Sequence, residues 1–210
     1  MNGMRMHHTN FNDHNMASDL SPKAAEIAEH ATTLLAAGGY NGFSYADISE
    51  RVHISKASIH HHFPSKAELV RTVVAQYRAQ AREGMAALDS RAADPLAALS
   101  AYVDYWSACI QDSKSSFCIC AMLAAELPAI PAEVADEVRG HFQDLSAWLA
   151  AVLEKGAAKG QFHLQGSATA ESRAFMATVH GAMLAARAFG DPKAFQAIVQ
   201  PALARLAKPA

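Results

Sequence analysis

The chain has 210 residues, of which 51% are hydrophobic and 18% charged, and its formal net charge at pH 7 is −2. This length suffices for a sizeable core in one or two modules, and the small net charge excludes a bulk attraction to nucleic acid, so any such contact has to be local. No apolar run approaches the roughly 18 residues of a membrane span, while abundant alanine and few β-branched residues favour helices over sheets. We therefore predict an all-α protein with no membrane partner.

The first 20 residues are polar and have no helical period, so we predict a mobile tail over residues 1–20. This segment lacks the apolar core of a signal peptide, and we expect a cytoplasmic protein. Three cysteines, Cys109, Cys118 and Cys120, are an odd number, which favours reduced thiols over a disulfide framework.

Two capped helices are predicted next. Ser21 and Pro22 begin the first, with proline at the first helical position, and the glycine pair 38–39 ends it. Ser44 caps the second, with Asp47 three residues later, and this helix runs to about residue 52.

A short turn over residues 53–55 separates the second helix from a third that begins near Lys56. Because Pro64 cannot continue a helix and Ser65 can cap one, a fourth helix is predicted to begin near Lys66. Helix, three-residue turn and helix is the arrangement of a helix-turn-helix motif.

The third helix carries three consecutive histidines, residues 60–62. Side chains on a helix advance by about 100° per residue, so these three fan apart and cannot converge on one metal ion. Ile59 and Phe63 share the opposite face and are expected to pack on the second helix. The histidines are therefore expected to face outward.

In a helix-turn-helix the start of the second helix lies nearest the bases and phosphates. Small residues there allow a close approach, hydroxyls and imidazoles can hydrogen-bond to DNA, and lysines supply local positive charge. The predicted DNA-contacting residues are Ser44, Tyr45, Ser55, Lys56, Ala57, Ser58, His60, His61 and Lys66. The alternative is a small helical bundle with no nucleic acid partner.

The stretch GFSYADISERVHISKASIHHHFPSKAELV resembles the N-terminal DNA-binding domain of the TetR/AcrR family of bacterial transcriptional regulators, and the resemblance covers about residues 23–77. It implies a homodimeric repressor that binds a palindromic operator and releases it when an inducer binds. Two positions depart from the family pattern. His53 stands where the turn usually has glycine, and His60 stands where a phosphate-contacting tyrosine is common.

Long alanine-rich helices follow, at about 95–113, 118–127, 131–157, 167–189 and 191–207, which makes about nine helices in all. We predict a helix-turn-helix domain over residues 21–75 and a ligand-binding and dimerisation bundle over 76–210. The last two helices combine apolar stripes with many alanines, and in the resembled family they form the dimer. The predicted dimer residues are Phe175, Val179, Ala182, Ala186, Phe195, Ile198, Ala202 and Leu206. Alternatively, these stripes face the monomer's own core.

The other C-terminal helices are expected to enclose a ligand pocket lined by aromatic, sulfur-containing and imidazole side chains. The candidates are Tyr102, Trp106, Cys109, Cys118, Met122, Phe142, Met176 and His180. Such side chains are more often plain core residues. His180 is the more informative one, because a polar group in an apolar stripe usually has a partner.

The segment FCICAMLAAEL places Cys118 at a helix start, where a thiolate is stabilised. From Cys118 to Glu126 it is similar to a subgroup of TetR-like repressors that respond to electrophiles, so we hypothesise a sensing thiol; the alternative is an inert core cysteine. Cys118 and Cys120 would point apart on a helix, so no metal and no cofactor is predicted. In a loop, with Cys109 or a histidine, they could converge and serve a soft-metal regulator.

We predict no enzyme activity. A cysteine-dependent enzyme is the alternative from another class, but no nucleophile motif or phosphate-binding loop accompanies Cys118. A helical binding module without DNA affinity is a further alternative.

Overall fold

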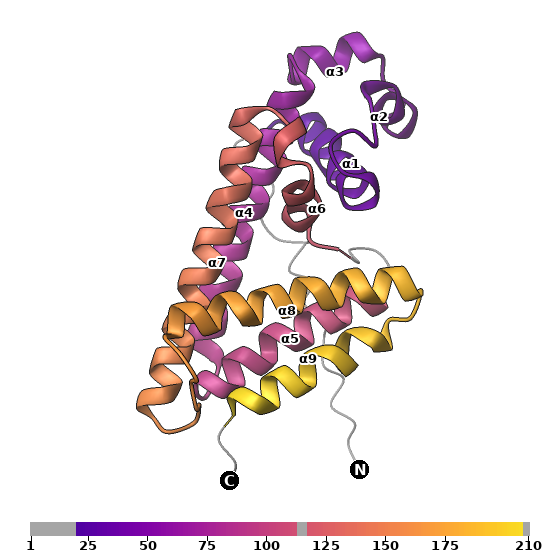
Figure 1. The fold of residues 1–210 in the computed structure, drawn as a ribbon. Coiled ribbons are helices and arrows are strands. Elements are labelled where there is room, and N and C mark those ends of the chain that lie inside the picture. Colours follow the sequence, from indigo (N-terminus) through magenta and orange to yellow (C-terminus); the bar gives the residue numbers. More distant parts are fainter. Residues whose placement is uncertain (1–19, 113–116, 208–210) are drawn as a thin grey trace, which may run out of the picture.

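The computed structural model describes residues 20–112 and 117–207, and it is all-α over these ranges (Figure 1). The predicted tail thus lies outside the described residues, except for its last position. The elements are α1 (Pro22–Gly38), α2 (Tyr45–Val52), α3 (Lys56–His62), α4 (Lys66–Arg91), α5 (Pro95–Gln111), α6 (Ile119–Ala125), the 3-10 helix η1 (Leu127–Ala129), α7 (Ala132–Ala158), α8 (Ala168–Phe189) and α9 (Lys193–Leu206). The predicted fold class is confirmed, and only an isolated bridge between Phe162 and Ala207 resembles β-structure in the described ranges.

The helix starts follow from local capping. Ser44 and Asp47 form a complete capping box, in which the Ser44 side chain accepts from the first turn and Asp47 accepts from the Ser44 amide at 2.7 Å. Ser55 and Ser65 cap α3 and α4 by accepting hydrogen bonds from backbone amides three residues later. These bonds satisfy amides that have no partner inside the helix.

Helices α1, α2 and α3 form a small head beside the first turns of α4 (Figure 1). Its core is apolar and includes Ile48, Ile59 and Phe63, which are almost completely buried, as the sequence pattern predicts. Burial of each such side chain contributes roughly 2 kcal/mol. This core fixes α3 against α2 and leaves the opposite face of α3 uncovered.

Below the head, α4 and α7 run side by side as a long pair, and α5, α8 and α9 form a second layer across their far ends (Figure 1). Arg78 of α4 joins the pair by hydrogen bonds to Asp144 at 2.6 Å and Glu137 at 3.3 Å on α7. The short α6 packs against both α1 and α7, so it lies between the head and the lower layer. Within the described ranges, no helix combines the length and the apolar character needed to cross a membrane.

Candidate functional site

The turn before α3 adopts the conformation that its position requires. His53 has φ 55° and ψ 42°, the left-handed region, and it is the only non-glycine residue with positive φ among those described. The Ser49 hydroxyl donates to the Ile54 carbonyl at 2.5 Å and holds the turn in place. A non-glycine residue in this conformation costs about 1 kcal/mol, so the turn is formed at an energetic expense.

The start of α3 is open to solvent. Ser55, Lys56 and Ala57 are exposed, as are His60 and His61. Ser58 is half-buried. The outward face of α3 therefore carries the small, hydroxyl and imidazole side chains that the sequence analysis assigned to it.

His60 is held in one orientation. Its Nδ1 lies 3.1 Å from the Pro64 carbonyl oxygen, which can only accept, so Nδ1 is the donor. Its ring also packs edge-on against Tyr45, with 4.7 Å between centroids. The Nε2 atom of His60 is then the one left to act as a hydrogen-bond acceptor when the ring is neutral.

Two of the predicted DNA contacts are placed differently from expectation. Tyr45 is buried, with 8% of its surface exposed, and its hydroxyl donates to the Phe63 carbonyl at 2.9 Å. It supports α3 from behind, because the first residue of α2 points into the head core. Burial raises the pKa of Tyr45 to about 12.

Lys66 is also turned inward. Its ammonium donates to the Phe43 carbonyl and lies 4.3 Å from the Phe43 ring centroid and 4.7 Å from that of Tyr40. Burial lowers the pKa of Lys66, although Glu126 and Asp47 act in the opposite direction. In this structure Lys66 holds the loop between α1 and α2, whereas Lys56 stays exposed.

A cluster of sulfur and imidazole groups lies beneath the head. Cys118, Cys120 and His141 are all buried, and their ligand atoms lie within 4.8 Å of one another. Cys118 Sγ is 3.9 Å from His141 Nε2. From the sequence we expect the two cysteines to point apart, because residues two apart on a helix do so. They converge instead because Cys118 precedes α6 and has extended backbone (φ −66°, ψ 119°). We call these three residues the thiol–imidazole cluster.

His141 is the member that the sequence analysis missed. It lies on α7 between Val138 and Leu145, at spacings of three and four residues, and so belongs to the buried stripe of that helix. A polar residue in an otherwise apolar stripe was the signal that could have identified it.

The cluster changes the acidity of both thiols. Burial acts to raise the pKa of Cys118, but the neighbouring Cys120, His141 and His180 side chains outweigh burial and hold this pKa well below the usual value. Burial and the neighbouring Cys118 raise the pKa of Cys120 well above its usual value. One thiol of the pair therefore loses its proton more easily at the expense of the other.

Three of the predicted ligand residues carry buried polar atoms without a hydrogen-bond partner in the described part of the chain. The Tyr102 hydroxyl, Trp106 Nε1 and His180 Nε2 are buried and have no partner at hydrogen-bonding geometry among the residues that the structure describes. Buried polar atoms of this kind usually have a partner. The remaining candidates on the described helices are half-buried: Cys109, Met122, Phe142 and Met176.

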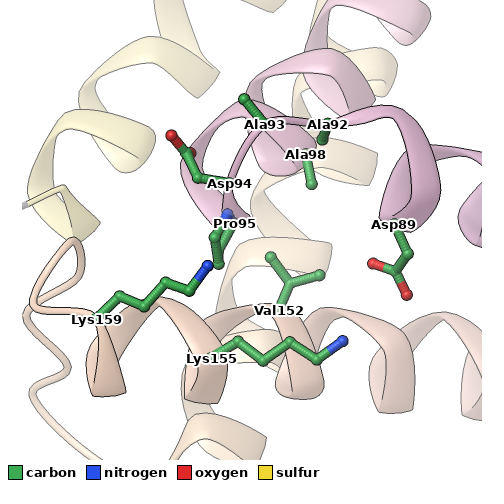
Figure 2. A pocket seen from close by; sticks show the side chains of 9 residues that line it. All are labelled: Asp89, Ala92, Ala93, Asp94, Pro95, Ala98, Val152, Lys155 and Lys159. Carbon is green, nitrogen blue, oxygen red and sulfur yellow. The ribbon is translucent and has the colours of Figure 1, made fainter.

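Two surface hollows lie elsewhere. One, of about 290 Å³, is formed where α4 meets α5 and is bordered by α7, and its lining includes Asp89, Asp94, Lys155 and Lys159 (Figure 2). The other lies along α4 and α7 around Arg82, Met85 and Trp148. Neither is lined by a predicted ligand residue, so the predicted pocket does not coincide with either hollow.

Comparison with known proteins decides the family. Residues 27–73 match the family described as bacterial regulatory proteins of the TetR family, and residues 95–201 match a Tetracyclin repressor-like C-terminal domain. The chain belongs to the TetR family. It is a helix-turn-helix transcriptional regulator, and the family is one of regulators, not of enzymes.

Individual relatives agree with this assignment. A TetR-family transcriptional regulator from Agrobacterium tumefaciens is 54% identical, covers 89% of this chain and 98% of its own, and superposes with a TM-score of 0.87. A TetR regulator from Legionella pneumophila, 23% identical, shares the fold with a TM-score of 0.80 over 90% of this chain and 100% of its own. The negative regulator IcaR of the biofilm operon icaADBC in Staphylococcus epidermidis is 41% identical over 49 residues, which are 23% of this chain and 26% of IcaR. This chain thus matches only about a quarter of that curated relative.

In this TetR-family chain, α6 connects the cluster to the head. Its first residues follow Cys118, and at its other end the Glu126 carboxylate accepts a hydrogen bond from the Tyr40 amide at 2.6 Å. A β-carbon at Gly39 would lie 2.4 Å from the same carboxylate. Arg187 of α8 adds a second link by donating to backbone carbonyls at the end of α1.

The predicted dimer stripes of this family member are mostly internal. Ile198 is exposed and Ala202 is half-buried, but the other predicted dimer residues are buried within the monomer: Phe175, Val179, Ala182, Ala186, Phe195 and Leu206. These six therefore fill the chain's own core, which is the alternative given above. The solvent-facing side of α8 carries a different series, Ala174, Ala177, Gly181, Leu184 and Ala188.

Proposed function

We propose that this regulator acts in the cytoplasm as a homodimeric repressor that binds a palindromic operator through α3 and leaves it when an effector acts near Cys118. The observation that carries the proposal is the open face of α3, which presents Ser55, Lys56 and Ala57 while Ile59 anchors the helix from behind. A second copy is needed because one such head contacts only a single half-site, and paired heads read half-sites about 34 Å apart.

The exposed faces of α8 and α9 support the pairing. Among the described residues, the large apolar side chains that are exposed all lie on these two helices: Leu184 (58%), Phe189 and Ile198 (37%). Around Leu184, small residues leave the α8 surface flat, and a β-carbon added at Gly181 would meet nothing within 4 Å. Two copies of α8 and α9 can therefore approach closely and form a four-helix interface.

The burial of Cys118 and the link from α6 to the head support the proposed effector site. Cys118 has no exposed surface, so a group added to its sulfur has no room unless α6 or its neighbours move. Because Glu126 at the other end of α6 holds Tyr40, such a movement changes the position of the head. An electrophile such as a maleimide forms a sulfur–carbon bond as its double bond opens, and the displaced proton goes to the adjacent carbon.

A small-molecule inducer that does not react with thiols is the second candidate. Three buried polar atoms without partners, on Tyr102, Trp106 and His180, favour a ligand with hydrogen-bonding groups.

The DNA-binding part is tested by fluorescence anisotropy with the DNA upstream of the protein's own gene. Lys56→Ala should weaken binding and reduce the slope of log affinity against log salt by about 1, because one phosphate contact is lost. Lys159→Ala is the matched control, since Lys159 is exposed beyond the end of α7 that lies far from α3 (Figure 1). Equal binding by wild type and Lys56→Ala would contradict the assignment of α3.

The effector part is tested with N-ethylmaleimide. Treatment should release wild-type protein from the operator, and mass spectrometry should locate the adduct on Cys118. Cys118→Ser should stay bound after treatment, while Cys109→Ser should respond like wild type. If Cys118→Ser leaves the operator at the N-ethylmaleimide concentration that releases wild type, Cys118 is not the sensing thiol. The DNA-binding proposal would be unaffected.

A further inference from the structure

The thiol–imidazole cluster has the composition of a metal site. Thiolate and neutral imidazole are the ligands that structural zinc prefers. Cys118, Cys120 and His141 reach one point from two separate elements, α6 with its preceding residue and α7. No ordinary packing requirement brings two thiols and an imidazole together, because each could be replaced by an apolar side chain of similar volume.

The distances suit a tetrahedral ion. With Zn–S near 2.3 Å and Zn–N near 2.0 Å, ligand sulfur and nitrogen atoms lie roughly 3.6 to 3.8 Å apart. Cys118 Sγ and His141 Nε2 are already 3.9 Å apart, and the longest separation in the set stays within 4.8 Å. Side-chain rotations that move the ligand atoms of these three residues by up to about 1 Å would therefore bring them to the distances of a bound ion.

His180 of α8 is the candidate for a fourth ligand. It lies outside the set whose ligand atoms are within 4.8 Å of one another, but its Nε2 is buried without a hydrogen-bond partner among the described residues, and its imidazole contributes to the lowered pKa of Cys118. Its ring packs against Phe142, the neighbour of His141 on α7, with 5.2 Å between centroids. A side-chain movement that brings this nitrogen to the ion would complete the fourth position and satisfy the nitrogen.

We propose that Cys118, Cys120, His141 and His180 form a tetrahedral site for Zn²⁺. Charge selects this ion. Two thiolates and two neutral imidazoles make a complex with Zn²⁺ that has no net charge, whereas the same ligands with Cu⁺ would leave one negative charge in a buried environment, which is unfavourable. Binding releases the two thiol protons to solvent. This metal site is a proposal separate from the effector response, and it can be tested without measuring DNA binding.

The site is tested with reduced, anaerobic full-length protein and Co²⁺ as a spectroscopic substitute. One Co²⁺ per chain should give the intense visible bands of a tetrahedral ion and a near-ultraviolet band from thiolate-to-cobalt charge transfer, and one equivalent of Zn²⁺ should abolish both. The charge-transfer band should fall by about half in Cys118→Ser and in Cys120→Ser, since each removes one thiolate. Cys109→Ser should keep the wild-type spectrum.

The histidines and the thiols are tested separately. His141→Asn should weaken Zn²⁺ binding by about 10-fold or more, and His180→Gln should shift the visible bands as an oxygen or water ligand enters. Alkylation of wild-type protein gives a measurement that needs no variant, because Zn²⁺ should protect Cys118 and Cys120 but not Cys109. Circular dichroism of each metal-free variant checks that it folds.

Several results would overturn the site. Unprotected Cys118 and Cys120 at saturating Zn²⁺, or a wild-type cobalt spectrum in the Cys118→Ser, Cys120→Ser double variant, would do so. Binding of Cu⁺ without Zn²⁺ or Co²⁺ would refute the choice of ion. A protein that binds Co²⁺ as described but no operator DNA would refute the proposed function and leave the site standing.

Discussion

At the scale of single residues, His53 shows how a local departure from the family pattern is accommodated. Glycine is usual at this turn in the resembled family, and the structure places His53 in the left-handed region that glycine tolerates best. The geometry of the motif is therefore kept although the residue is unfavourable for it. The Ser49 bond to Ile54 and the packing of Ile59 supply the compensating free energy.

His53→Gly is expected to raise the free energy of unfolding by about 0.5–1 kcal/mol, because the left-handed strain disappears and part of that gain is lost to the greater freedom of glycine in the unfolded chain. Urea titration at fixed protein concentration measures it. His61→Gly is the matched control, since it makes the same replacement at an exposed position inside α3 and should destabilise by about 1 kcal/mol. If both variants lower the free energy of unfolding, the His53 backbone is not strained.

Local signals also explain which positions of the candidate residues could be predicted from the sequence and which could not. The face of α3 could be predicted because caps and helical spacing depend on residues close in sequence. The inward position of Tyr45 could not, because its partner Phe63 is 18 residues away. His141 escaped for the same reason, since it meets Cys118 across 23 residues and only the packing of α6 on α7 joins them.

At the scale of elements, α6 is the part of the fold that joins the thiol–imidazole cluster to the head. It is short, is followed at once by η1, and contacts the head through α1. Its predicted span of about 118–127 agrees with Ile119–Ala125 to within two residues. The sequence did not reveal that Glu126 holds the amide of Tyr40, 86 residues away.

Glu126→Ala should separate sensing from release. Without the carboxylate, movement of α6 is no longer transmitted to the end of α1, so N-ethylmaleimide should still modify Cys118 but reduce operator affinity much less than in wild type. The free energy of unfolding should also fall by roughly 1.5–3 kcal/mol, because a hydrogen bond to a charged acceptor is lost. Anisotropy with and without modification and urea titration measure the two effects.

Glu133→Ala is the control for this prediction. Glu133 is exposed in the first turn of α7, and its replacement removes the same charge. It should behave like wild type in both measurements. A full response to the maleimide in Glu126→Ala would place the transmission elsewhere, with the bonds from Arg187 to Ala36 and Ala37 as the other observed link between the lower layer and α1.

At the scale of the whole molecule, the burial of most predicted dimer residues inside the monomer has a physical reason. The sequence pattern identifies the most apolar stripe of α8 and α9, and the chain uses that stripe for its own core, where burial contributes most. The outer stripe, through which we propose that two copies associate, is less apolar because it has to be compatible with solvent in the separate chains. Its pattern of small residues around Leu184 is consequently weaker in the sequence than the core stripe beside it.

Leu184→Glu combined with Ile198→Glu should convert the proposed dimer to a monomer, because four carboxylates would be brought together in an apolar interface. Sedimentation velocity measures the mass. Operator affinity should fall by roughly 100-fold or more, since the second head no longer binds as part of the same complex, while a single half-site should be bound as by wild type. Ala86→Glu, at an exposed position on α4, is the control and should remain dimeric. A double variant that stays a dimer would show that the copies pair through another face, and the 34 Å spacing of the heads would then have to come from a different arrangement.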